Sequence, residues 1–161
     1  MKSKDTINIL FCGIGGQGVL TASEVAAWAA IYAGYHVKKS EVHGMSQRGG
    51  SVDSHLRFGQ DVFSPLIPAK QADYLVCFDQ GEHAVKKNFL KPNGRDLIAA
   101  LEDGQRIAAD KRYLNIFLLG RLSQYLKIEE KDWIMALERI FSQRYLPQNK
   151  RVFYLGRGEG I

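Results

Sequence analysis

The stretch Ile7-Asn8-Ile9-Leu10-Phe11-Cys12-Gly13-Ile14-Gly15-Gly16-Gln17-Gly18 decides the fold of this 161-residue chain. Its apolar start is typical of a buried strand, and the glycines open an alanine-rich segment with apolar residues at three- and four-residue spacing. Strand, glycine turn and helix in this order form a dinucleotide-type fingerprint. Because bare backbone also lets a helix pack closely on a sheet, two interpretations stay open, ligand binding and tight packing.

The glycine turn supplies the first candidate site. Glycines there free the backbone and let a phosphate or a neighbouring chain approach the amides at the start of the following helix. The residues predicted to make such a phosphate or partner contact are Gly13, Gly15, Gly16, Gln17 and Gly18.

The rest of the chain predicts an α/β fold: a Rossmann-like, open, mostly parallel sheet with flanking helices in three layers, in a single domain over residues 1–161. Apolar or alternating runs predict strands at 7–12, 35–39, 51–58 and 74–78, and helical spacing predicts helices at 17–33, 82–90, 108–125 and 129–144. Residues 152–155 are predicted to be extended, and 91–94 to form a turn. Residues 95–102 then have a helical pattern where a strand is expected, so either the protein is shortened near 94–96 or residues are missing from the sequence there.

Composition argues against several classes of function. The 22 Lys and Arg residues exceed the 17 Asp and Glu by five, but they are scattered and not interleaved with aromatic residues, so no nucleic-acid partner is predicted. No apolar run approaches the roughly 20 residues of a membrane span, and the chain starts with polar residues, which predicts a cytoplasmic protein without a membrane partner. Cys12 and Cys77 form no CxxC motif or Cys/His cluster, so neither a disulfide nor a metal or iron–sulfur site is predicted.

Residues 41–50 are predicted to form an ordered functional loop, the alternative being a plain solvent loop. Glu41 lies near the spacing at which nicotinamide-binding proteins place an acid for the ribose, although it falls inside a polar, glycine-rich segment. The residues predicted to form an interface here are Glu41, His43, Ser46, Gln47 and Arg48.

No residue stands out as a catalyst. Asp79 follows a buried strand and so faces the expected ligand crevice. Alternation places Asp53, His55 and Arg57 on one strand face, which is predicted to be a hydrogen-bonded surface rather than a catalytic row.

Several segments together resemble the gamma-type subunit of 2-oxoacid:ferredoxin oxidoreductases, and most of all the small subunits of the indolepyruvate enzymes. The resemblance is carried by residues 13–21, 40–52 and 64–67, with Ala72-Asp73, and is weaker after residue 94, where 113–120 and Gln148-Asn149 are similar.

The resemblance implies an accessory subunit of a heteromeric complex that oxidatively decarboxylates an aryl 2-oxoacid to its acyl-coenzyme A and passes electrons to ferredoxin. It implies a large partner subunit that holds thiamine diphosphate and iron–sulfur clusters, coenzyme A in the complex, and no cofactor on this chain alone. Two alternatives remain: a stand-alone NAD(P)- or flavin-binding oxidoreductase, and a small phosphate-binding module without chemistry.

Overall fold

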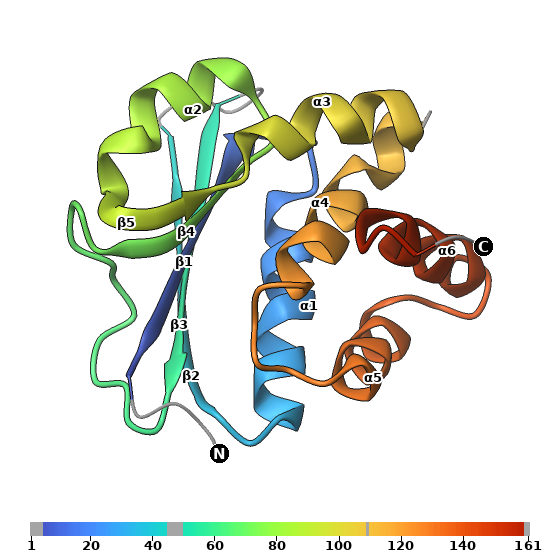
Figure 1. Cartoon of the computed structure of the whole chain (residues 1–161), viewed down its shortest axis with the longest axis horizontal. Helices are drawn as coiled ribbons and strands as arrows, with labels where there is room; N and C mark the ends of the chain where they lie inside the picture. Colours follow the sequence, from blue (N-terminus) through green and yellow to red (C-terminus); the bar gives the residue numbers. More distant parts are fainter. Residues whose placement is uncertain (1–4, 45–49, 109, 160–161) are drawn as a thin grey trace.

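The computed structural model describes residues 5–44, 50–108 and 110–159 of the chain. Its centre is a five-stranded open sheet with the strand order β2-β3-β1-β4-β5 (Figure 1). The strands are β1 (Ile7–Ile14), β2 (His36–His43), β3 (Ser51–Gly59), β4 (Ala72–Cys77) and β5 (Leu90–Asp96). The α-helices are α1 (Val19–Tyr32), α2 (Gln80–Lys86), α3 (Ile98–Ile107), α4 (Leu114–Ser123), α5 (Glu130–Ile140) and α6 (Leu146–Gly156), with short 3-10 turns at Lys87–Phe89 and Lys111–Tyr113.

The strand directions confirm an open α/β sheet that is mostly parallel. β1 pairs with β4, and β4 with β5, in parallel, whereas β3 is antiparallel to both β1 and β2. β3 is therefore the single reversed strand of the described sheet. It lies between β1 and β2, where a nicotinamide-binding Rossmann unit would place those two strands side by side.

Helices cover one face of the sheet in two layers. α1 packs directly on it, α4 and α5 pack against α1, and α6 packs against α4 (Figure 1). The alanines of α1 are almost completely buried, since their small side chains let the helix approach the sheet closely. α4 and α6 touch through their backbones at Gly120 and Gly156, because a Cβ on Gly120 would lie 2.1 Å from the carbonyl oxygen of Phe153.

The other face has a thinner cover. Leu10, Cys12, Leu75 and Cys77 form a second core there with Ile67, beneath α2, the turn at 87–89 and the irregular segment 60–71. The three predicted layers are therefore unequal. The prediction that the cysteines form no disulfide is wrong: Cys12 and Cys77 are register partners on β1 and β4 and are joined to each other.

Two predicted elements differ. Residues 91–94 are not a free turn but part of the edge strand β5, whose pairing with β4 shifts register between Ala72 and Tyr74. An edge strand with such an irregularity tolerates Pro92, which has no amide hydrogen to donate. Residues 152–155 belong to α6 rather than to an extended piece, and the helix expected after residue 94 begins at Ile98. Whether residues are missing near 94–96 stays a prediction.

Candidate functional site

The glycine turn joins β1 to α1 and is braced from within. The side-chain oxygen of Gln17 accepts a hydrogen bond from the amide of Ile14 at 2.9 Å, and the Gln17 amide donates to the Ile14 carbonyl at 3.2 Å. Gly13 has no room for a side chain, because a Cβ there would lie 2.7 Å from that Gln17 oxygen and 2.8 Å from Val19. Gly13 and Gln17 thus shape the turn.

Gly16 and Gly18 both have a left-handed backbone conformation, with φ values of 91° and 78°. Their surroundings differ. A Cβ on Gly18 would lie 2.4 Å from the side-chain nitrogen of Asn115, which donates to the Gly18 carbonyl from α4 at 3.2 Å. Among the described residues, a Cβ on Gly16 would meet nothing within 4 Å, so Gly16 is the point of the turn that another molecule can approach.

Some amides of the turn are already used. The Gly15 amide donates to the carbonyl of Gly50 at 3.0 Å, which ties the turn to the start of β3. Within the part of the chain that the structure describes, the amides of Gly16 and Gly18 donate to no acceptor. These two groups lie at the positive end of the α1 dipole, which favours an anion.

A hollow of about 460 Å³ lies beside the turn, between the ends of β1 and β4 and the helices that follow residue 97. β2 and β3 lie on one side of β1 in the strand order and β4 lies on its other side, so the order reverses between β1 and β4. Ligands of open α/β sheets usually bind at such a point. The lining of the hollow combines backbone, apolar and polar groups from Gly16, Gln17, Phe78, Gly104, Gln105, Asp110, Lys111 and Leu114. Lys111 is exposed and supplies a cation to it.

A second, more open hollow of about 430 Å³ lies on the opposite side of the turn, toward the hairpin of β2 and β3. It brings Gly15, Gly16 and Gly18 together with His43 and Val52. The structure therefore places one predicted interface residue, His43, against the predicted glycine site. Ser46, Gln47 and Arg48 lie outside the described residues.

Glu41 does not reach the glycine turn. It is part of β2, opposite Ser54 of β3, which in turn lies opposite Phe11 of β1. Two strand spacings, about 10 Å, separate Glu41 from β1. Its carboxylate instead accepts a hydrogen bond from Lys39 at 2.9 Å. The spacing in the sequence suggested the ribose-binding acid, but the inserted strand β3 removes Glu41 from that position.

Asp79 also has a local structural task. Its carboxylate accepts a hydrogen bond from the Glu82 amide at 3.0 Å and caps the start of α2. One residue further along α2, the His83 ring lies 2.6 Å from the Asp96 carboxylate, and this pair ties α2 to the end of β5. The acid predicted to face the crevice is therefore used to position a helix.

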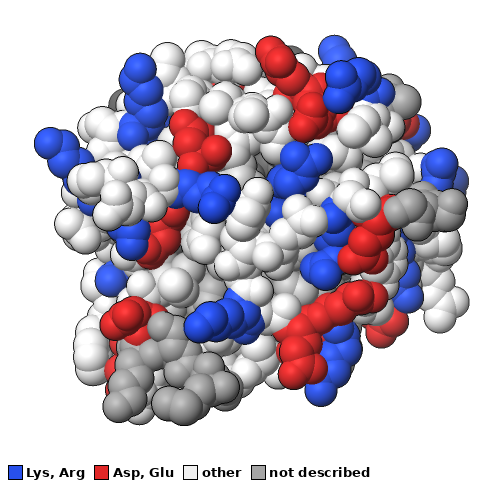
Figure 2. Space-filling view, in the orientation of Figure 1, with Lys and Arg blue, Asp and Glu red and all other residues white. Residues whose placement is uncertain are grey.

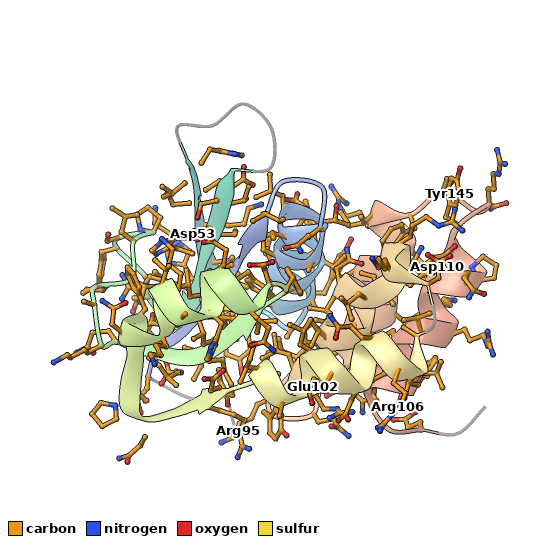
Figure 3. All side chains as sticks on the ribbon, turned by 90° about the horizontal axis from the view of Figure 1, so that it is seen from above. Asp53, Arg95, Glu102, Arg106, Asp110 and Tyr145 are labelled. Atoms are coloured by element: carbon orange, nitrogen blue, oxygen red, sulfur yellow. A yellow bond between two sulfur atoms is a disulfide. The ribbon has the colours of Figure 1, made fainter. Side chains whose placement is uncertain are left out.

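α2 is joined to β3 by polar pairs. Ser51 contacts Glu82, and Asp53 contacts Lys86 at 2.6 Å. The two pairs lie side by side because residues two apart on a strand share a face, as do residues four apart on a helix. Asp53 is buried, on the α2 side of the sheet, far from Asp110 on the helical side (Figure 3). One of its carboxylate oxygens, Oδ1, has no hydrogen-bond partner among the residues that the structure describes.

His55 continues this row under segment 60–71. Its Nδ1 accepts a hydrogen bond from the Ile67 amide at 3.0 Å, and its ring meets Phe89 edge-on. Burial lowers the pKa of His55 below its ordinary value of 6.5, although the nearby carboxylate of Asp53 acts in the opposite direction. The face that the sequence predicted to be a hydrogen-bonded surface is hydrogen-bonded, but Asp53 and His55 are buried by α2 and segment 60–71.

Within the described residues, no group of three or more His, Cys, Asp or Glu side chains is arranged to hold a metal ion. No helix in these ranges combines the length and the apolar character needed to cross a membrane. Sequence reasoning missed Gln105, Asp110 and Lys111 in the larger hollow. No motif marks them, because they come from a segment far from the glycines in sequence that only the packing of α4 brings near the turn.

The fold and the glycine turn define an α/β protein with a ligand-type crevice at the point where the strand order reverses. The chain belongs to the pyruvate ferredoxin/flavodoxin oxidoreductase family, whose sequence profile matches residues 8–159.

Among relatives, it is similar to the indolepyruvate oxidoreductase subunit IorB of Thermococcus kodakarensis, with 48% identity over 87 residues. That match covers 54% of this chain and 43% of the relative, less than half of its length.

Two solved structures share the fold. One is a 2-oxoglutarate:ferredoxin oxidoreductase from Magnetococcus marinus with 2-oxoglutarate, coenzyme A and succinyl-CoA bound. The match has a TM-score of 0.80 and 19% identity, and it covers 97% of this chain and 31% of the chain of that enzyme. The gamma subunit of a keto/oxoacid ferredoxin oxidoreductase from Geobacter sulfurreducens matches with a TM-score of 0.77 and 19% identity, over 96% of each chain.

Proposed function

We propose that this chain is the small, gamma-type subunit of a 2-oxoacid:ferredoxin oxidoreductase that acts on indolepyruvate. The complex would decarboxylate the 2-oxoacid, transfer the acyl group to coenzyme A and pass the electrons to ferredoxin. The observation that carries the proposal is the family match over residues 8–159. The choice of indolepyruvate as the substrate is supported by the 48% identity, over 87 residues, with an indolepyruvate oxidoreductase subunit.

In this proposal the thiamine diphosphate and the iron–sulfur clusters are held by a large partner subunit. The sulfur atoms of Cys12 and Cys77 are bonded to each other and both residues are fully buried, so this pair does not fit a cluster. Coenzyme A supplies the thiol that accepts the acyl group. The groups of this chain that suit its anionic part are the amides of Gly16 and Gly18 and the ammonium of Lys111, which line or adjoin the larger hollow.

The β2–β3 hairpin is proposed as a contact with the partner. His43 lines the hollow beside the glycine turn, and Arg48, at a position outside the described residues, is an interface residue predicted from the sequence alone. We expect Arg48→Ala to weaken assembly or the turnover of the complex without lowering the melting temperature of the isolated chain. A large fall in that temperature would make Arg48 structural instead.

The proposal includes a cytoplasmic location and no nucleic-acid partner. Lysines and arginines alternate with aspartates and glutamates on the face shown in Figure 2 and form no continuous basic stripe there. A phosphate backbone is bound by such a stripe.

The test is to assay the chain alone and together with its large subunit. Alone, it should not reduce a viologen dye with indolepyruvate and coenzyme A, whereas the pair should do so, and other 2-oxoacids should be poorer substrates. Indolepyruvate-dependent turnover by the isolated chain would refute the accessory role.

The stand-alone oxidoreductase remains the alternative, and calorimetry separates it from the subunit. A nicotinamide enzyme should bind NAD(H) or NADP(H) with micromolar affinity. The distance of Glu41 from the glycine turn argues against this, because no acid of β2 lies beside the strand that carries the glycines. Micromolar binding of either nucleotide would restore the alternative.

A further inference from the structure

An exposed apolar surface lies on the thinly covered side of the sheet. Among the described residues, the three most exposed large apolar side chains are those of Phe63, Val85 and Leu66, at 90%, 64% and 52%. Phe63 and Leu66 belong to segment 60–71, and Val85 belongs to α2. We call this surface, completed by the exposed Pro68, Ala69 and Ala84, the proline-segment surface.

The sequence holds this segment in one conformation. Val62 and Ile67 are buried and anchor it, which leaves Phe63 and Leu66 pointing outward. Arg57 donates hydrogen bonds to the carbonyls of Ser64, at 2.7 Å, and Leu66, at 3.4 Å. Two prolines restrict the backbone further. A segment fixed in this way loses little conformational entropy when another molecule binds to it.

Segment 60–71 and α2 lie on the same side of the sheet and are joined at one point. The Lys70 amide donates to the carbonyl of Asn88 at 3.1 Å, which joins the end of the segment to the turn that follows α2. On α2, Glu82 and Lys86 contact β3, whereas Val85 is exposed to solvent. The structure therefore holds both parts in place by hydrogen bonds and ion pairs and leaves their apolar side chains without cover.

The charges around this surface indicate what covers it. Lys70 and Lys87 are exposed beside it, and no carboxylate among the described residues pairs with either; the one exposed carboxylate of the segment is that of Asp61, near its start. A facing surface that is apolar at its centre and carries carboxylates at its edge would complement them. A second copy of this chain would offer these lysines a single exposed carboxylate on this surface, that of Asp61, so it complements them less well than an acid-edged partner.

We infer that the proline-segment surface is the docking site for the large subunit of the complex, through an apolar depression edged by Asp and Glu side chains. Phe63 is the central anchor, and Lys70 and Lys87 set the orientation. The inference rests on the proposed function and adds to it the surface used, on the side of the sheet opposite α1 and α4.

The experiment measures the affinity of the purified chain for the large subunit from the same genome. Phe63→Ser and Leu66→Ser should each weaken binding, Phe63→Ser by about thirtyfold. Met135→Ser is the matched control, because Met135 is 44% exposed on α5, in the outer helical layer. Lys70→Glu with Lys87→Glu should weaken binding and reduce its salt dependence, whereas Lys131→Glu on α5 should do neither.

Each outcome decides something. No binding by the unmodified chain would refute the proposed function itself. Normal binding by Phe63→Ser and Leu66→Ser, with the unmodified chain binding tightly, would refute only the docking surface. A dimer of the isolated chain that Phe63→Ser separates would assign the surface to self-association and also refute the inference. Because Phe63 is 90% exposed, thermal unfolding should show that these variants stay folded.

Discussion

Replacing Gly18 with alanine tests whether packing against α4 fixes the glycine turn. A left-handed conformation costs a residue with a side chain about 1–2 kcal/mol. At Gly18 the new Cβ would also lie 2.4 Å from the side-chain nitrogen of Asn115, which is only 7% exposed. Moving Asn115 breaks its hydrogen bond to the Gly18 carbonyl and leaves a buried amide short of a partner, at about 1–3 kcal/mol. We expect a total loss of roughly 2–5 kcal/mol.

Gly16→Ala is the matched control. Its φ of 91° carries the same conformational cost, but no atom of the described residues lies within 4 Å of the added Cβ, so the loss should stay at about 1–2 kcal/mol. Urea unfolding gives both free energies, and each kcal/mol should lower the melting temperature by about 2–4 °C in a protein of this size. The double variant Gly18→Ala/Asn115→Ala removes the collision and should be more stable than the sum of the single losses predicts.

Equal losses for Gly16→Ala and Gly18→Ala, or strict additivity in the double variant, would refute this account of the turn. The result also bears on function. If Gly16→Ala stays folded but lowers turnover of the complex, the open point of the turn is a contact. If only Gly18→Ala affects turnover, the turn acts through its shape.

Three further predictions concern the thinly covered face. Lys86→Met should destabilise the protein by about 3 kcal/mol in urea unfolding, since it leaves the buried carboxylate of Asp53 unpaired, whereas Lys87→Met at an exposed position should not. His55 binds a proton less readily in the folded than in the unfolded state, so its contribution to stability should be complete above pH 6.5 and decrease as the pH falls below that value; an NMR titration of His55 with a pKa at or above 6.5 would contradict this. The denatured, unreduced chain should contain no free thiol, and Cys12→Ala/Cys77→Ala should lose up to about 4 kcal/mol because the bond closes a loop of 65 residues; two titratable thiols would disprove the bond.

The sequence determined the parts of the fold that depend on neighbouring residues. The apolar run before the glycines predicted β1, the alanine spacing predicted α1, and the pattern near Tyr74 predicted β4, because periodicity and turn chemistry are local properties. The same local reasoning predicted a contact for the glycine turn as a whole, and the structure adds that Gly16 is its most open point among the described residues; the contact itself stays a prediction. It was wrong at residues 91–94, where the irregular pairing of an edge strand accommodates Pro92, and at residues 152–155.

Only the tertiary structure decided which distant residues meet. The insertion of β3 between β1 and β2 moved Glu41 away from the glycines, and the parallel register of β1 and β4 brought Cys12 and Cys77 together across 65 residues. Packing on α4 gave Asn115 its contact with Gly18. Strand order, register and helix packing depend on which surfaces bury most area together, and no short window of sequence contains that information.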